Sequence, residues 1–395
     1  MTSFDKLRQL GVDFGPNGDQ AVETTVTIKD VDQLKWLLDI GLDDKGRAEH
    51  FAALFGSTGK GEGLADELVR NVAAYAVGDE ALTDEAREAV APAFPLKVAV
   101  TADPQPITVD GKKDLSHTDG TSNVVVYTDV TMKPGGYFYC AATNLTFTCD
   151  TFTRADPIGN VSDFQIVGLT PATPGKPDKP AQAGRAGSGG PGECSSAGIA
   201  GHGGGDGTTG DRGTKGTDGT NGDNGTGSQG ATIWIKKTLS APQLAFYTQS
   251  GPGAKGGDGG DGGLGQPGGN GGNGVSCGCT GNAGGSGKAG GPGGKGGRAG
   301  DGGNGTDALG NITVYVPTVA DLAKVQKVQV GAPPGEAGTP GNGGDGGDGG
   351  TGGSGGKHND GGSGAGKGGQ GDPGDRGSRG TYTGKAAEVV PNLHP

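Results

Sequence analysis

Glycine occupies every third position through long stretches of the second half of this 395-residue chain, and no other feature constrains the fold as strongly. The uninterrupted runs are 198–225, 253–274, 278–296, 335–356 and 368–380. A period of three residues is that of the polyproline II conformation, which rises about 3.1 Å per residue without internal hydrogen bonds. Such a segment stays ordered only where neighbouring segments bind its amides, and a glycine in every turn lets the backbones approach.

Three structures are compatible with this period. A disordered linker fits the composition, in which apolar residues reach only 30% and aromatic residues 5%. A collagen triple helix requires more proline than these runs contain, and each break in register would disrupt it. A bundle within one chain fits the run lengths, because each run can go out, turn and pack against its return. We predict this bundle, with turns at 275–279 and 357–360.

The segments GGDGGDGGLGQPGGNGGNG and GGPGGKGGRAGDGGNG resemble the polyglycine II helix bundles of springtail antifreeze proteins and phage tail-tip adhesins, and are similar in texture to mycobacterial glycine-rich surface proteins. The resemblance covers 184–380 at most, and this chain differs in its large N-terminal part and longer runs. In the adhesins, loops at the ends of the glycine-rich helices contact the host receptor. The resemblance therefore implies that the turns 275–280 and 357–360 are recognition tips. The ligand-binding candidates are Ser276, Thr280, Lys357, His358, Asn359 and Asp360.

The first 180 residues look like an ordinary globular protein. Residues 1–93 carry helical patterns: leucines at 34, 37 and 38 follow a capping aspartate, either Asp30 or Asp32, and further helices are expected at 46–55, 63–77 and 83–92. Short apolar runs then predict a β-strand domain at 94–170. A stiff proline-rich linker follows at 171–183, then the glycine-rich bundle at 184–384 and a tail at 385–395.

Two apolar segments, 231–249 and 311–330, interrupt the glycine runs and begin 80 residues apart. Each is typical of two short strands and a turn, so the layout suggests an internal repeat of two strands plus one glycine-rich excursion. The predicted fold class is therefore multidomain. It comprises a small N-terminal α-helical region, a β-strand region, and a bundle of polyglycine II helices interleaved with short β-strands.

The five cysteines do not form a metal-binding motif. Cys140 and Cys149 end two apolar runs on either side of a turn, so a hairpin would bring them together in a disulfide; two free, half-buried thiols are the alternative. Cys277 and Cys279 form a C-x-C, which is not the spacing of a zinc ribbon or a thioredoxin-like site. Either of them could pair with Cys194. A disulfide would indicate an oxidising final location.

The net charge of −12 argues against nucleic acid and against an anionic membrane surface as partners. No run of 18 apolar residues exists, so we expect no membrane span. The first residues lack the layout of a classical signal peptide. We expect an extracellular, cell-surface or virion location, by a route that leaves the N-terminus intact, with a cytoplasmic location still open.

Motifs for catalysis, metals and cofactors are weak. GSTGKG at 56–61 is too short for a phosphate loop, and the match of GGDGGDGGL to a calcium-binding nonapeptide lacks the nine-residue period. The five histidines are scattered without metal-ligand spacing. An enzyme at 94–180 would depend on Asp103, Asp110, Asp114 and His117. We therefore expect no enzyme, no metal and no cofactor.

The predicted function is that of a non-enzymatic structural or adhesive protein, whose rigid scaffold presents recognition loops to a cell-surface glycan or protein receptor. The N-terminal region would serve self-association or particle assembly. Two alternatives remain open. One is an ice-binding protein of the antifreeze type, and the other is a collagen-like or disordered glycine-rich stalk attached to a small N-terminal binding domain.

Overall fold

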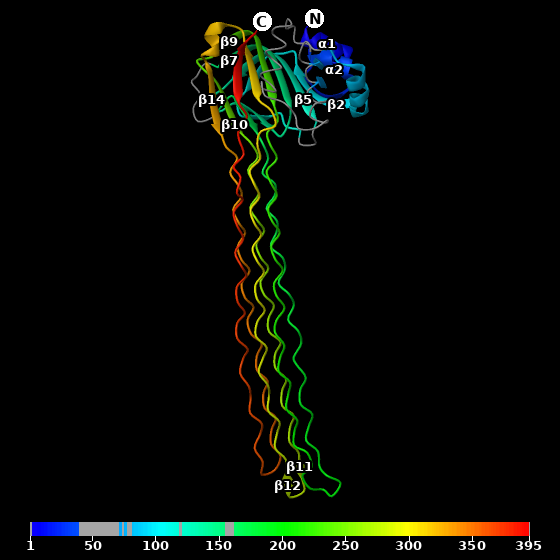
Figure 1. Cartoon of the computed structure of the whole chain (residues 1–395), viewed down its shortest axis with the longest axis vertical. Helices are drawn as coiled ribbons and strands as arrows, with labels where there is room; N and C mark the ends of the chain where they lie inside the picture. Colours follow the sequence, from blue (N-terminus) through cyan, green and yellow to red (C-terminus); the bar gives the residue numbers. More distant parts are fainter. Residues whose placement is uncertain are drawn as a thin grey trace.

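The computed structural model describes residues 2–38, 71–72, 75–76, 81–117, 121–154 and 162–394. It has a β-sheet head and a long stalk, and both chain ends lie at the head (Figure 1). The expected helix at 46–55, most of that at 63–77 and the segment 56–61 lie outside the described residues. The expected helix at 83–92 corresponds to α5 (Asp84–Val90), which Thr83 caps by accepting a hydrogen bond from the Ala86 amide.

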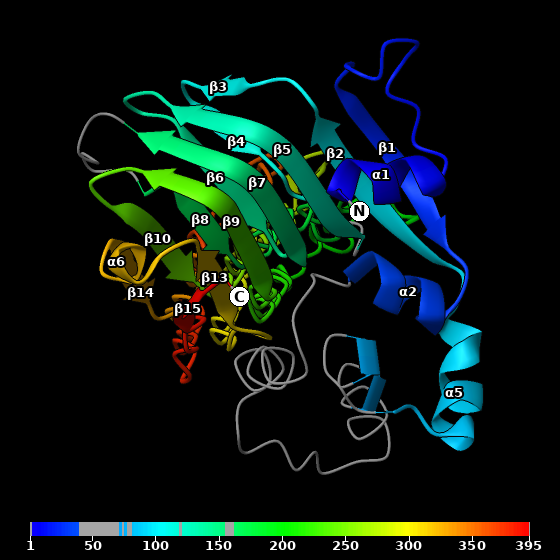
Figure 2. The same ribbon diagram turned by 90° about the horizontal axis from the view of Figure 1, so that it is seen from above.

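Two sheets form the head (Figure 2). In the first, the order is β1-β2-β5-β7-β9-β13-β15, with β3 also beside β5. Its strands are β1 (Val22–Ile28), β2 (Leu96–Asp103), β3 (Ile107–Val109), β5 (Ser122–Met132), β7 (Leu145–Arg154), β9 (Ala231–Ser240), β13 (Ile312–Val316) and β15 (Val389–Leu393). The order of the second sheet is β14-β10-β8-β6-β4. Its strands are β4 (Lys112–Asp114), β6 (Tyr137–Ala141), β8 (Phe164–Val167), β10 (Leu244–Gln249) and β14 (Val325–Val330).

From β5 onward the chain alternates between the two sheets, so that each pair of strands forms one coil. Within each sheet, neighbouring coils pair in parallel. Equivalent residues therefore stack on their neighbours in the core. Phe164 stacks between Phe138 and Phe246, with ring centroids 5.2 Å away on either side. All three rings are fully buried, so this stack fixes the spacing of the coils.

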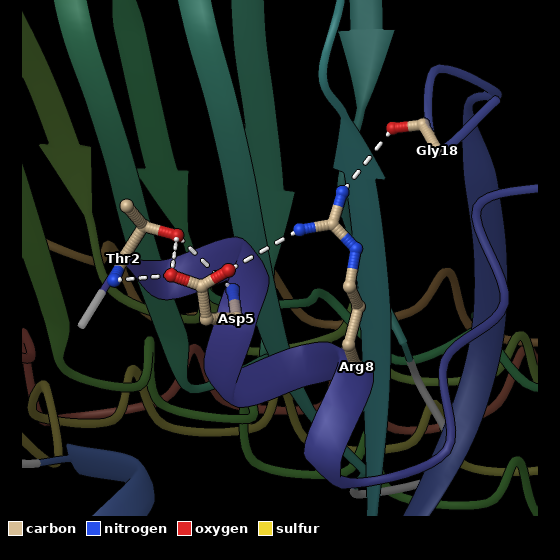
Figure 3. A network of polar contacts seen from close by, with 4 residues as sticks. All are labelled: Thr2, Asp5, Arg8 and Gly18. Atoms are coloured by element: carbon tan, nitrogen blue, oxygen red, sulfur yellow. Dashed lines mark hydrogen bonds and ion pairs between the residues drawn. The ribbon is translucent and has the colours of Figure 1, made fainter.

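The N-terminal segment closes one end of the head. α1 (Ser3–Gln9) lies beside β1 and β2 and buries Leu7 against them. Figure 3 shows its capping box, in which Thr2 accepts from the Asp5 amide and the Asp5 carboxylate accepts from the Thr2 amide. Arg8 binds that carboxylate and the carbonyl of Gly18, so the loop before β1 is tied to the helix.

Three further short helical elements of the head have described bounds. α2 (Val31–Leu38) follows β1, the 3-10 turn η1 (Ala91–Ala93) follows α5, and α6 (Val319–Leu322) lies between β13 and β14. A capping Asp30 is confirmed for α2, because its carboxylate accepts from the Gln33 amide.

The predicted fold class is wrong. The regular secondary structure consists of two multi-stranded β-sheets with a few short helices, and it is not a polyglycine II helix bundle. The apolar segments 231–249 and 311–330 are not interleaved in such a bundle, because β9, β10, β13 and β14 are members of the head sheets. The expected helical region contributes β1, and the expected tail contributes β15. Sheet pairing therefore crosses the predicted domain boundaries.

The glycine-rich segments leave these sheets as three loops of extended chain, which together form the stalk (Figure 1). Each loop leaves after a strand of the second sheet and returns to a strand of the first. We call the segments 171–192, 251–274 and 332–356 the first, second and third outgoing arms. The segments 201–227, 282–307 and 361–384 are the corresponding return arms. At about 3.1 Å per residue, an arm of this kind is roughly 70 Å long.

Each arm is hydrogen-bonded to its neighbours, and the second outgoing arm shows the pattern. The Gly256 amide donates to the Glu336 carbonyl in the third outgoing arm (2.9 Å), and the Gly257 amide donates to the Thr220 carbonyl in the first return arm (2.8 Å). The same two bonds recur every third residue. Outgoing arms thus form one layer, return arms form a second, and the layers are bonded to each other.

The number of glycines in each triplet depends on how many neighbouring arms surround that part of the chain. In the inner arms two residues of each triplet face other backbones, so the repeat is Gly-Gly-X. An ideal Cβ on Gly259 would lie 2.2 Å from the Gly297 carbonyl oxygen, and one on Gly260 would lie 3.2 Å from backbone atoms of Thr217. The first return arm lies at an edge, and there one glycine per triplet is enough.

The segment predicted as a proline-rich linker is part of the stalk. Pro174, Pro177 and Pro180 follow the three-residue period and lie against glycines of the second outgoing arm. Lys176 extends from the same segment to Asp261, with a 2.9 Å ion pair. The prolines preset an extended backbone, so this segment forms the start of the first outgoing arm.

The third residue of many triplets also has a structural role. Asp258 accepts a hydrogen bond from the Thr339 amide of the next outgoing arm (2.8 Å). The aspartates and asparagines that receive neighbouring amides in this way are Asp206, Asp218, Asn221, Asn224, Asp258, Asp261, Asn270, Asn273, Asp301, Asn304 and Asp307. These side chains form ladders that bind amides of the neighbouring arms.

These ladders predict that acid weakens the stalk. The hydrogen bond from the Thr339 amide lowers the pKa of Asp258 to about 2, and the Asn342 amide lowers the pKa of Asp261. A carboxyl whose folded pKa is depressed adds stability above its unfolded pKa of about 3.9, and this stability is lost as pH falls through the folded pKa. We expect the protection factor of the Thr339 amide to fall between pH 5 and pH 2.

Asp258→Asn is the matched variant, because asparagine keeps the side-chain carbonyl acceptor but does not titrate. We expect its Thr339 protection factor to change less with pH than in the parent protein. Amide hydrogen exchange followed by NMR measures both quantities. The same pH dependence in parent and variant would mean that the carboxylate ladder does not stabilise the stalk.

Candidate functional site

Three turns meet at the end of the stalk farthest from the head (Figure 1). They are 193–200, 275–281 and 357–360, and we call them together the tip. The second contains the two-residue strands β11 (Ser276–Cys277) and β12 (Thr280–Gly281). The sequence predicted the second and third turns as recognition loops, and it missed the first.

A disulfide between Cys194 and Cys277 joins the first turn to the second, with the Cα atoms 5.6 Å apart. The Ala200 amide also donates to the Thr280 hydroxyl (3.0 Å). Cys279 is a free, exposed thiol. Two turns that are far apart in the sequence are thus fixed to each other.

The predicted pairing of Cys140 with Cys149 is wrong. Both are free buried thiols, because β6 and β7 belong to different sheets and do not form a hairpin. Burial raises the pKa of Cys140 to about 12 and also raises the pKa of Cys149. Both thiols are therefore protonated at neutral pH and act as small core residues.

The third turn is fixed to the second by polar contacts. The Lys357 amide donates to the Ser276 hydroxyl (2.9 Å), and the Asn359 side-chain amide donates to the Gly281 carbonyl (2.7 Å). Of the predicted ligand-binding residues, Ser276, Thr280 and Asn359 therefore hold the tip together. Their side chains remain exposed at the surface.

Asn282 is a tip residue that the sequence did not single out. It is 7% exposed. Its side-chain amide donates to the carbonyls of Glu193 and His202, and its side-chain carbonyl accepts from the Val275 amide (3.1 Å). It binds both ends of the first turn to the start of the second return arm. A single asparagine among many gives no sequence signal for such a role.

The remaining predicted residues form the exposed chemistry of the tip. Lys357, His358 and Asp360 are exposed, and no hydrogen bond or ion pair with other described residues engages their side chains. His358 has a φ of 58°, which is uncommon for a residue other than glycine and is typical of a tight turn. Ile199 of the first turn is 57% exposed. The tip thus offers a cation, a carboxylate, an imidazole and an apolar side chain within one rigid unit.

Two of the residues considered for catalysis have local structural contacts. Asp103 accepts from the Gln105 amide (2.9 Å) and Asp114 from the Ser116 amide (3.0 Å). Among the described residues, no group of three His, Cys, Asp or Glu side chains could hold a metal ion. In that same part of the chain, no helix combines the length and apolar character needed to cross a lipid bilayer.

Comparison with known proteins adds little. No family model matches the chain, and no curated protein matches it. Among solved structures, it is similar to the nine polyproline type II helical bundle springtail antifreeze protein from Granisotoma rainieri, with 24% identity over 42% of this chain and 94% of that chain. The TM-score is 0.08, so this likeness supports no argument about fold or function.

Proposed function

We propose that this is a non-enzymatic binding protein whose stalk carries the tip away from the head to meet a glycan or protein receptor on a surface. The head holds the ends of all three loops and serves as the attachment or assembly part. An extracellular, cell-surface or virion location accords with the tip disulfide, because such bonds persist in oxidising environments.

The observation that carries the proposal is the fixation of three separate turns into one unit. A disulfide, the Thr280 and Ser276 hydroxyls and the Asn282 and Asn359 amides hold these turns before any partner is present. Preorganised side chains lose less conformational entropy on binding, which favours recognition. The hydrogen-bonded arms keep this unit at a distance from the head.

The test removes the exposed chemistry and leaves the fixing contacts in place. We expect the triple variant Lys357→Ala, His358→Ala and Asp360→Ala to lose at least about tenfold in affinity, or about 1.4 kcal/mol. The matched control is Asp178→Ala with Lys179→Ala, because both residues are exposed on the first outgoing arm, away from the tip. We expect this control to bind as the parent does.

The probes are a printed array of surface glycans and intact cells, with and without protease treatment. A glycan receptor gives array binding that survives protease, whereas a protein receptor gives cell binding that protease abolishes. If the triple variant binds as well as the control does, the tip is not the recognition site.

Ice binding fits the stalk less well. Its return layer carries ion pairs between arms, such as Lys288 with Asp206 (2.7 Å) and Lys295 with Asp375 (2.9 Å). Charged pairs of this kind hold irregular hydration rather than an ice-like array. Thermal hysteresis in a solution of the purified protein would instead favour ice binding over receptor binding as the function.

A further inference from the structure

The third outgoing arm is the last of its layer, and nothing in the described chain continues the pattern beyond it. In the second outgoing arm, the amide of the first glycine in each triplet donates to the third outgoing arm. Gly262, Gly268, Gly271 and Gly274 donate in this way, to the carbonyls of Asn342, Asp348, Thr351 and Ser354. A fourth outgoing arm could accept hydrogen bonds from the third outgoing arm in the same manner.

The equivalent amides of the third outgoing arm are unpaired. They belong to Gly343, Gly346, Gly349, Gly352 and Gly355, and within the described residues none of them donates a hydrogen bond. All of them are half-exposed except Gly346, which is buried. A row of donors three residues apart therefore lies along this edge.

The same edge also carries side-chain acceptors. Asp258 and Asp261 stand at the third position of their triplets and receive the amides of the next arm. Asn342, Asp345 and Asp348 hold that position in the third outgoing arm and are exposed. In the described part of the chain, the side chains of Asp345 and Asp348 form no ion pair. The edge thus offers both kinds of contact that the inner arms use.

Only the half of the edge near the tip is open. Near the head, the positions that would face another arm carry Pro334, Ala337 and Pro340, while Pro373, Arg376 and Arg379 stand on the adjacent return arm. Prolines and charged side chains prevent an edge from pairing with another chain. Near the tip, the first position of each triplet in 343–355 is a glycine, and Gly361 and Gly364 stand opposite on the return arm, while Lys367 and Gln370 follow them in the direction of the head.

We propose that this open edge, formed by residues 343–355 with Gly361 and Gly364, binds an extended glycine-rich peptide segment that lies parallel to the third outgoing arm. In this conformation, one carbonyl oxygen in every three residues points to the same side of the segment, and this spacing matches that of the unpaired amides. Its own third-position amides face Asn342, Asp345 and Asp348. A glycine at each contact lets the two backbones approach, as between the second and third outgoing arms.

We take the occupant to be an extended segment of another chain of this composition, because the inner arms of a folded copy are already bonded to their neighbours on both sides. This site is separate from the chemistry of Lys357, His358 and Asp360. Loss of one activity therefore leaves the other measurable.

The experiment uses the full chain and a fluorescein-labelled peptide with the sequence 341–356, GNGGDGGDGGTGGSGG. A peptide of the same composition with its triplets scrambled is the control. We expect fluorescence anisotropy to show at least about tenfold weaker binding of the scrambled peptide. Amide exchange of Gly343, Gly349 and Gly352 should slow when the ordered peptide is added.

Gly364→Arg places a side chain on the edge, where an ideal Cβ has no neighbour closer than 3.6 Å, so the stalk can still fold. Gly369→Arg is the matched control, because a Cβ there meets nothing within 4 Å and its place in the triplet puts it on the outer face of the return layer. We expect the first variant to lose at least about tenfold in peptide affinity and the second to lose none.

Three outcomes would overturn the proposal. Equal binding of the ordered and scrambled peptides would mean that the three-residue spacing of glycines does not determine binding. Equal affinity of the two arginine variants would place the peptide elsewhere. A concentration-dependent dimer in sedimentation velocity that Gly364→Arg abolishes would identify a second copy as the occupant.

Discussion

Gly368→Ala is expected to lower the free energy of unfolding of the stalk by about 3 kcal/mol, whereas Gly369→Ala, one residue further, is expected to leave it unchanged or raise it. An ideal Cβ on Gly368 would lie 2.0 Å from the carbonyl oxygen of Gly291, which is backbone and cannot rotate away. The Gly368 amide also donates to the Gly347 carbonyl (2.8 Å). The second and third return arms cannot move apart to make room for the alanine side chain without breaking hydrogen bonds.

Gly369 is the control because a Cβ there would meet nothing within 4 Å. An alanine at such a position narrows the conformations of the unfolded chain and adds about 0.4–1 kcal/mol. Thermal unfolding followed by circular dichroism gives the two free energies, and amide exchange in 361–384 locates the change. Similar melting of the two variants would mean that backbone contact does not set the glycine pattern.

Arg154→Met is expected to destabilise the head by about 3–5 kcal/mol. The Arg154 guanidinium donates to the Asp163 carboxylate at 2.6 Å, and both side chains are at most 3% exposed. Arg154 also donates to the Gly136 carbonyl, and Asp163 receives the Ala245 amide. Methionine fills a similar volume but leaves the Asp163 charge buried without its cation.

Lys215→Met is the control for this pair. Lys215 binds Asp218 on the stalk surface, where the two side chains are 54% and 53% exposed, so its loss should cost less than about 0.5 kcal/mol. Urea unfolding monitored by tryptophan fluorescence reports on the head. Loss of less than 1 kcal/mol in Arg154→Met would show that the buried pair is not needed to hold these coils together.

The local patterns of the sequence predicted local structure well. The helix at 83–92 appears as α5, and the apolar runs at 94–170 appear as strands. Pairing between residues about 80 positions apart leaves no local signal. The sequence therefore did not show that β9, β13 and β15 complete the sheet begun by β1, or that Pro174 and Pro177 lie against the second outgoing arm.

The candidate site was predicted in part. The breaks in glycine period at 275–279 and 357–360 mark two turns, because a run must leave its register to reverse. The first turn was missed because 184–201 reads as one glycine-rich segment. Its end is marked by Cys194, whose partner Cys277 lies 83 residues away. The spacing of the cysteines did not indicate whether Cys277 or Cys279 pairs with Cys194.

The attachment of every arm to a sheet strand at its head end also determines how the molecule carries force. A pull on the tip along the stalk is divided among all the arms, since each turn is continuous with two of them. Hydrogen bonds between arms run across this direction and are loaded in shear, so many must break together before one arm slides. The tip can therefore bear tension that a single extended chain of the same sequence would transmit through one backbone.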